Sequence, residues 1–189
     1  MKLDHPKLVR SLQLAFSAER AAAFAYFGHA GSLRDREERC KVQEIEKDEW
    51  DHRDHVLSIM RQYDIPISNY YEWKFYFIGR MIGFCCYFIG WFMPYFFAGR
   101  LESGNVCEYF VMMRYFRELG ISEHDEALYE MGIREKEHEM YFLETVKGNR
   151  LLPIFETIFR WGEDRSFNDI ELSPAPTIDE AKSACGNRD

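Results

Sequence analysis

The sequence lacks several features that would assign it to a common class. It has no cluster of lysine and arginine, and 32 acidic against 24 basic residues leave a net charge of −8, which argues against nucleic acid as a partner. It contains no Cys-x-x-Cys pair, which excludes a rubredoxin-type iron site within this chain. No segment alternates polar and apolar residues between turn residues, so the predicted fold class is all-α.

The cysteines also lack a pattern. There are five, an odd number that forms no recognisable disulfide framework. Cys85 and Cys86 lie inside an apolar run, while Cys40, Cys107 and Cys185 are scattered and have no evident pairing. The first ten residues are polar and show no signal or transit pattern. We therefore expect a reducing compartment and a cytoplasmic protein, with a peripheral position on a membrane as the alternative.

A length of 189 residues with 47% hydrophobic content is enough for one domain with a real core and a tail. We expect a helical bundle over residues 1–150, and a short helix followed by a poorly ordered tail over residues 151–189. Turn residues and caps place four bundle helices, the last of which has Ser122 as its N-cap. In chain order they cover about residues 6–31, 32–63, 74–120 and 123–148, with a crossover at residues 69–73.

Two of these helices carry the same arrangement of a glutamate and a histidine. Glu49 and His52 lie on the apolar seam of the second helix, and Glu135 and His138 lie on that of the fourth. In both, an apolar residue stands four positions before the glutamate and another four positions after the histidine. Burying an ionisable pair is costly unless the pair has a partner or binds a metal. The two Glu-x-x-His pairs therefore indicate two halves of one metal site.

A bundle site of this kind needs one inward glutamate from each of the two other helices. The seam of the first helix has apolar residues in a 4-3-4-3 spacing, and Glu19 is its only acidic member. In the third helix, Glu102 lies at the centre of an inward stripe, while Glu108 lies on a neighbouring face. We prefer Glu102 for its central place in the inward stripe; its interval to Glu135 is 33 residues, against 27 for Glu108 and 30 from Glu19 to Glu49.

The residue types suit a particular chemistry. Carboxylates can bridge two metal ions, and oxygen-rich sites with a few imidazole nitrogens favour iron or manganese over metals that prefer thiolates. Four carboxylates and two neutral histidines balance the charge of two divalent cations. We therefore expect a site for two iron ions, with manganese as the alternative, and chemistry with dioxygen.

A second notable feature of the sequence is the run of eighteen uncharged residues, 81–98, which lies between Arg80 and Arg100. The run leads directly into the third ligand helix and is interrupted by Pro94, so a membrane span is the least favoured interpretation. The second interpretation is a buried core helix or a homodimer face, because aromatic stripes at helical spacing are usually part of a protein core. The third is a surface that docks on a bilayer and admits a hydrophobic substrate, which the tryptophans and tyrosines of the region support.

The chain resembles the ferritin-like di-iron carboxylate superfamily, and within it the demethoxyubiquinone hydroxylase family most closely. The resemblance covers roughly residues 10–147. It rests on the segments Glu19-x-x-Ala22-x-x-x-Tyr26-x-Gly28, Ile45-x-x-x-Glu49-x-x-His52, Leu101-Glu102-Ser103 followed by Tyr109, and Glu135-x-Glu137-His138. The run before Glu102 is far more aromatic than the small-residue helix expected in the family, and the segment after Asn149 has no counterpart there.

The resemblance implies a ferritin-like four-helix bundle with a long crossover between its second and third helices. It implies iron ligands at Glu19, Glu49, His52, Glu102, Glu135 and His138. It also implies a monooxygenase that uses dioxygen and an electron donor to hydroxylate a hydrophobic, quinone-like substrate. Tyr26 and Tyr109, on inward stripes near these positions, could gate the site or relay electrons, although such tyrosines are more often core residues.

Two other functions use the same residues. A ferroxidase or peroxide scavenger of the ferritin–rubrerythrin kind would reduce oxygen or peroxide at the same ligands. A scaffold with vestigial ligands would need no metal, and the presence of acceptable ligands at all six positions argues against it.

Overall fold

A computed structural model describes residues 3–162, and every regular element in that range is a helix, which confirms the all-α class. The chain divides into two compact units, Met1–Pro94 and Tyr95–Asp189, here called the N-terminal and C-terminal units. The helices are, in chain order, α1 (Pro6–Ser32), α2 (Arg36–Gln62), α3 (Asn69–Cys85), α4 (Phe92–Glu118), α5 (Asp125–Val146) and α6 (Leu152–Phe159).

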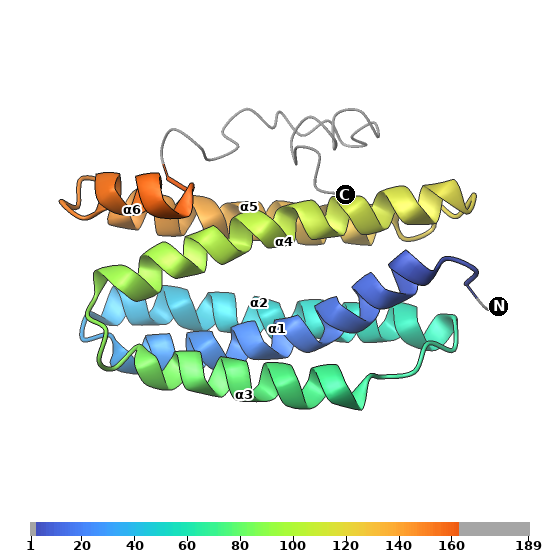
Figure 1. The fold of residues 1–189 in the computed structure, drawn as a ribbon, viewed down its shortest axis with the longest axis horizontal. Coiled ribbons are helices and arrows are strands. Elements are labelled where there is room, and N and C mark those ends of the chain that lie inside the picture. The colour runs from blue at the N-terminus through green and yellow to red at the C-terminus, as the bar shows by residue number, and fades with distance from the viewer. Residues whose placement is uncertain (1–2, 163–189) are drawn as a thin grey trace. The chain divides into compact units, whose positions relative to one another are not determined.

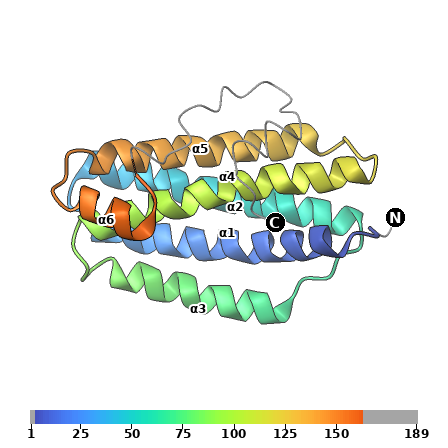
Figure 2. The ribbon, with the colours of Figure 1, turned by 45° about the horizontal axis from the view of Figure 1, so that its top comes forward.

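In the N-terminal unit, α1 packs against both α2 and α3 (Figures 1 and 2). The helix α2 runs antiparallel to α1, and α3 then runs back in the direction of α1. The contact between α1 and α3 is close because glycines face each other. A Cβ atom added to Gly28 would lie 2.3 Å from the Cα of Gly83, and one added to Gly79 would lie 2.4 Å from the carbonyl oxygen of Ala21. Only glycine permits this separation of the two backbones.

The ends of α1 and α2 follow from local chemistry. Pro6 begins α1, and the Nδ1 atom of His5 accepts a hydrogen bond from the backbone N–H of Leu8 at 3.0 Å. Asp35 caps α2 by accepting a hydrogen bond from the backbone N–H of Glu38 at 2.9 Å. Every residue of the predicted seam of α2 is buried: Val42, Ile45, Glu49, His52, Val56, Ile59 and Tyr63. The heptad spacing therefore identified the inner face of this helix.

In the C-terminal unit, α4 and α5 run antiparallel (Figures 1 and 2). The predicted stripe of α4 is buried throughout: Tyr95, Ala98, Glu102, Val106, Tyr109, Met113 and Phe116. The short helix α6 packs its aromatic residues against α4, where the rings of Phe96 and Phe155 lie 5.1 Å apart. The predicted cap of α5 was wrong, because His124 holds the N-cap position and Ser122 contributes its backbone carbonyl to the preceding turn.

The aromatic run 81–98 is not part of one long helix, which corrects the predicted third helix. Its first residues belong to α3 and its last to α4, and a turn containing Gly90 at φ +80° separates them. A positive φ breaks the helical repeat, and Pro94 is tolerated because it lies in the first turn of α4. The segment predicted as a crossover, residues 69–73, is likewise the first part of α3. The connection between α2 and α4 is therefore itself a helix.

The structure also bears on the expectations about a membrane span and about the cysteines. Among residues 3–162, no helix is both long enough and apolar enough to cross a bilayer. Cys107 of α4, for which the sequence shows no evident pairing, is disulfide-bonded. Cys40, Cys85 and Cys86 are free thiols. The predicted tail lies mostly outside the described residues, which end three positions after α6.

Candidate metal centre

The N-terminal unit brings three predicted ligands together. Glu19 of α1 and the pair Glu49 and His52 of α2 are all buried, and each offers one ligand atom within 4.8 Å of those of the other two. Glu49 and His52 face the same way because residues three apart lie on one side of a helix. The antiparallel packing of α1 on α2 brings Glu19 to the same level. These three residues are called the N-terminal triplet.

The cations that neighbour this triplet in sequence are held elsewhere. Arg20 follows Glu19, and Arg53 follows His52, yet both guanidinium groups bind Glu72 of α3. The distances are 3.0 Å from Arg20 Nη1 and 2.8 Å from Arg53 Nη2, both to Oε2 of Glu72. Glu72 therefore pairs with two arginines, each adjacent in sequence to a candidate ligand, and links all three helices of the unit.

The C-terminal unit carries a second group of the same composition. Glu102 of α4 and the pair Glu135 and His138 of α5 are buried, with one ligand atom of each within 4.8 Å of those of the other two. The Nδ1 atom of His138 lies 4.0 Å from Oε2 of Glu135. These three residues are called the C-terminal triplet. Each triplet thus contains two carboxylates and one imidazole.

Asn105 holds the two carboxylates of the C-terminal triplet. Its Nδ2 donates hydrogen bonds to Oε2 of Glu102 at 3.0 Å and to Oε2 of Glu135 at 3.4 Å. One amide nitrogen thereby fixes the separation of two acids that come from different helices. Sequence reasoning missed Asn105, although its position three residues after Glu102 places it next to that side chain on α4.

Glu108, the alternative ligand, lies in a different environment. It is half-buried and lines an open hollow of about 570 Å³ on the C-terminal unit, together with Arg100, Asn105 and residues 158–161. Leu101, which shares its face of α4, is 53% exposed. Glu102 is only 1% exposed and belongs to the triplet. It therefore lies on the inward stripe of α4, and Glu108 lies on the neighbouring, more exposed face.

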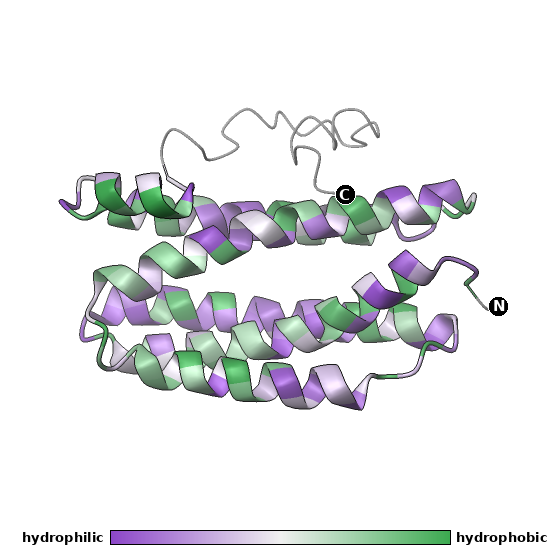
Figure 3. Ribbon diagram, viewed as in Figure 1, coloured by the Kyte–Doolittle hydropathy of each residue, from purple (hydrophilic) through white to green (hydrophobic). Residues whose placement is uncertain are grey.

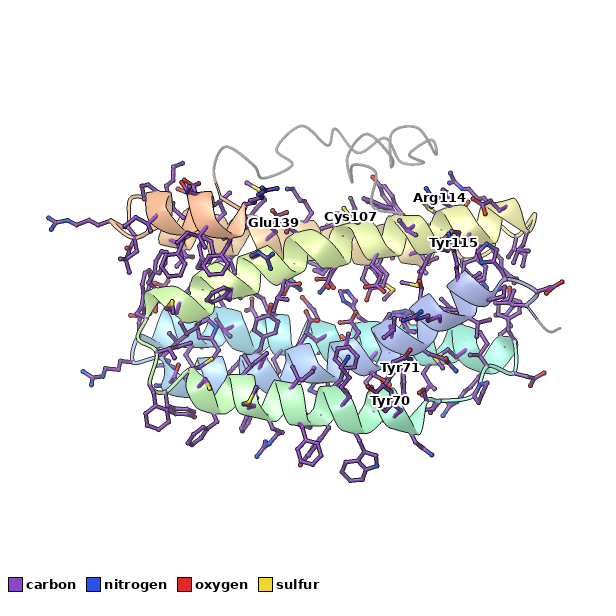
Figure 4. The ribbon with its side chains drawn as sticks, in the orientation of Figure 1. Tyr70, Tyr71, Cys107, Arg114, Tyr115 and Glu139 are labelled. Carbon is purple, nitrogen blue, oxygen red and sulfur yellow. The ribbon has the colours of Figure 1, made fainter. Side chains whose placement is uncertain are left out.

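A further buried acid, Glu139, follows His138 on α5 and serves the packing of the unit (Figure 4). Its Oε2 forms an ion pair of 2.8 Å with Lys136, and its Oε1 accepts a hydrogen bond of 2.9 Å from the indole nitrogen of Trp161. Lys136 directly follows the candidate ligand Glu135, so here too a cation beside a candidate ligand is bound by another carboxylate. Trp161 is buried and fixes the chain segment after α6.

The tyrosines predicted to serve the site, Tyr26 and Tyr109, are both buried, on α1 and α4 respectively. Their burial is compatible with a core position and with a role at the site, so the sequence-based prediction of a catalytic role stays a prediction.

Each triplet has the chemistry of a site for a divalent cation. Two carboxylates within a small buried volume repel each other, and burial disfavours their charged forms. A divalent cation would offset both charges, and oxygen ligands with one imidazole suit iron or manganese. The residues present therefore fit a metal ion, although nothing in the donor set alone selects iron.

Comparison of the chain with protein-family models, with curated proteins and with solved structures finds no match in any of the three.

Proposed function

We propose that the two triplets belong to one centre that binds two metal ions, iron in the active state, within a ferritin-like four-helix bundle. The observation that carries the proposal is the repetition. Each unit contains a buried Glu-x-x-His pair on one helix and a buried glutamate at the same level on its antiparallel neighbour. In this arrangement α1, α2, α4 and α5 form the bundle, and α3 serves as the long crossover.

The charges support two ions rather than one. Four carboxylates carry four negative charges, which two divalent cations neutralise while both histidines remain neutral ligands. Arg20, Arg53 and Lys136 would otherwise compete for these carboxylates. Their engagement by Glu72 and Glu139 leaves the ligands to a metal.

The activity we propose is that of a monooxygenase acting on a hydrophobic, quinone- or lipid-like substrate. Two ferrous ions, when bound, supply electrons and open coordination positions for the reduction of dioxygen. The chain's own contribution is to hold the ions between four carboxylates, to orient those carboxylates through contacts such as that from Asn105, and to keep water out. Tyr26 and Tyr109 would gate the site or relay electrons from a donor.

Metal binding is tested first. Titration of the metal-free protein with ferrous iron under anaerobic conditions should saturate at two ions per chain and raise the unfolding temperature, because a ligand of the native state stabilises it. Glu135→Ala should lose most of the metal. Glu137→Ala is the matched control, since Glu137 is the exposed acid two residues away and pairs with Arg134. A protein that takes up no metal and shows no thermal shift would overturn the proposal.

The reaction is tested next. Reduced, iron-loaded protein is mixed with a lipid extract of its source cells and exposed to dioxygen labelled with oxygen-18. One labelled atom should enter a hydrophobic compound, detected by mass spectrometry, and the Glu135→Ala variant should give no label. If the iron is oxidised while no compound gains the label, the site is a ferroxidase or peroxide-reducing site and the monooxygenase assignment is wrong.

A further inference from the structure

The helix α3 exposes its apolar face and buries the opposite one, which is the reverse of a usual amphipathic surface helix. The face that packs on α1 contains Gly79 and Gly83, whose backbones approach α1 closely, and the charged Glu72, which binds arginines of α1 and α2. A helix on the surface of a globular protein normally buries its apolar stripe and exposes its polar one. In α3 the glycines and the one acidic residue lie on the buried face instead.

The opposite face of α3 is aromatic. Side chains spaced 3-4-4-3-4 along the chain form one stripe on the helix and its following turn, and each is between 61% and 72% exposed. They are Tyr70, Trp73, Phe77, Met81, Phe84 and Phe88. A row of rings projects from the side of α3 away from α1 (Figure 4), and hydrophobic residues gather toward the C-terminal end of the helix (Figure 3). This set is called the α3 stripe.

The stripe is ordered by contacts among its own members. The rings of Trp73 and Phe77 stack with centroids 6.0 Å apart, and those of Phe84 and Phe88 lie 5.0 Å apart. A contiguous apolar patch of this size on a monomer marks a surface that meets something other than water. The stripe therefore needs an occupant.

The charges beside the stripe are both positive. Lys74 and Arg80 are exposed on α3, and within residues 3–162 neither forms an ion pair. Instead, the Nζ of Lys74 lies 5.5 Å from the ring centre of Phe75, and the guanidinium carbon of Arg80 lies 5.5 Å from that of Phe24. The one acid of α3, Glu72, is turned inward. An otherwise acidic protein thus presents a cationic and aromatic strip here.

We propose that the α3 stripe docks this protein on the surface of a lipid bilayer that contains anionic lipids. The aromatic side chains would enter the interfacial region, while Lys74 and Arg80 meet the headgroups. Charge complementarity favours this occupant over a second copy of the chain. Two facing stripes would bring Lys74 and Arg80 of one copy against the same cations of the other, whichever way the helices cross.

The proposal concerns the N-terminal unit and does not require the metal centre, so either can fail alone. Flotation with vesicles tests the apolar contribution. The full chain should float with vesicles of phosphatidylcholine and phosphatidylglycerol, and Phe77→Gln/Phe84→Gln should lower the bound fraction on the order of tenfold. Both positions are exposed, so the helical circular dichroism and unfolding temperature should not change.

The matched control is Ile154→Gln/Ile158→Gln, which removes two exposed apolar side chains of α6. This variant should bind vesicles as the wild type does. If it loses binding while the Phe77/Phe84 variant retains it, the docking surface lies on α6 and the proposal is overturned.

The electrostatic contribution needs its own variant. Lys74→Gln/Arg80→Gln should weaken binding to the anionic vesicles on the order of tenfold and should leave the weak binding to pure phosphatidylcholine unchanged. Lys41→Gln/Lys47→Gln removes the same charge from α2 and should have little effect. Equal weakening by both pairs would show that net charge alone matters and would remove Lys74 and Arg80 from the proposal.

A subunit interface gives a different result. Analytical ultracentrifugation of the wild type and of the Phe77/Phe84 variant, both without vesicles, should show the same mass. If the wild type is a dimer that the variant dissociates, and neither floats with vesicles, the α3 stripe binds a second copy and the membrane proposal is wrong.

Discussion

The guanidinium group of Arg53 donates two hydrogen bonds to the carboxylate of Glu72, with Nη1–Oε1 at 3.2 Å and Nη2–Oε2 at 2.8 Å. A two-point contact of this kind fixes direction as well as distance. It joins α2 to α3 across a separation of 19 residues in sequence, and the ion pair from Arg20 adds α1. The arginines that hold α3 on the unit therefore lie next to the candidate ligands Glu19 and His52 in sequence.

Replacement of Glu72 should destabilise the fold. Glu72→Gln leaves two partly buried arginines without their counter-charge, and we expect a loss of about 2 kcal/mol in the free energy of unfolding. Urea denaturation measures it. The control Lys47→Gln breaks an exposed ion pair with Asp51, which solvent screens, and should lower the free energy of unfolding far less. Similar losses in the two variants would show that the Glu72 cluster is only a surface ion pair.

The same cluster should respond to acid. Burial raises the pKa of Glu72, but the hydrogen bonds and positive charge of Arg53 and the charge of Arg20 outweigh it, so the pKa lies below the usual 4.5. Glu72 then stabilises the fold at pH values above 4.5, and this stabilisation is lost as the pH falls through the lowered pKa. The difference between wild type and Glu72→Gln should therefore shrink below pH 4.5.

Substitutions on α4 should separate the two candidate acids. Glu102→Gln removes a charged ligand of the C-terminal triplet, and we expect the metal content of the purified protein to fall by at least about half. Glu108→Gln changes a half-buried side chain in the wall of the hollow and should leave the metal content near normal. Elemental analysis of both proteins decides the matter. The reverse result would assign the ligand to Glu108 and with it a different inward face of α4.

Asn105 should matter for affinity rather than for folding. Asn105→Ala removes the donors that fix Glu102 and Glu135, and the loss of such a supporting contact typically weakens metal binding by about 10–100-fold. Calorimetric titration with Mn²⁺ measures this. Asn149→Ala, outside the helices and remote in sequence from the ligands, is the control and should bind metal normally. Unchanged affinity in Asn105→Ala would show that the two carboxylates are positioned without its help.

His29 on α1 should make stability depend on pH. Burial lowers its pKa from 6.5 to about 4, so the folded protein holds this imidazole neutral where the unfolded chain is protonated. Stability should then be full above pH 6.5 and fall as the pH decreases toward 4, by at most roughly 3 kcal/mol. The measurement is urea unfolding of wild type and His29→Gln across this range.

The variant should show a shallower decrease with falling pH, because glutamine does not titrate. His55→Gln, at an exposed position of α2, should keep the wild-type slope. If wild type and His29→Gln lose stability equally between pH 6.5 and 4, other groups are responsible for the dependence.

The sequence by itself determined what is local. Heptad spacing identified the inner faces of α2 and α4, because residues three and four apart share one side of a helix whatever surrounds it. Prolines and turn residues in the sequence placed the ends of α1 and α2 approximately. The six candidate ligand positions followed from the same periodicity, and in each unit the three expected residues lie together.

The tertiary structure decided what depends on distant residues. Hydrophobicity alone predicts that an aromatic stripe is buried, yet the stripe of α3 is exposed, because Gly79 and Gly83 allow their side of the helix to approach α1 most closely. The pairing of Glu72 with Arg20 and Arg53 joins three helices, and no spacing within one helix reveals it. Asn105 could be placed beside Glu102 from the sequence, but its bond to Glu135 depends on how α4 packs on α5. Periodicity specifies which side chains share a face, and only packing specifies what that face meets.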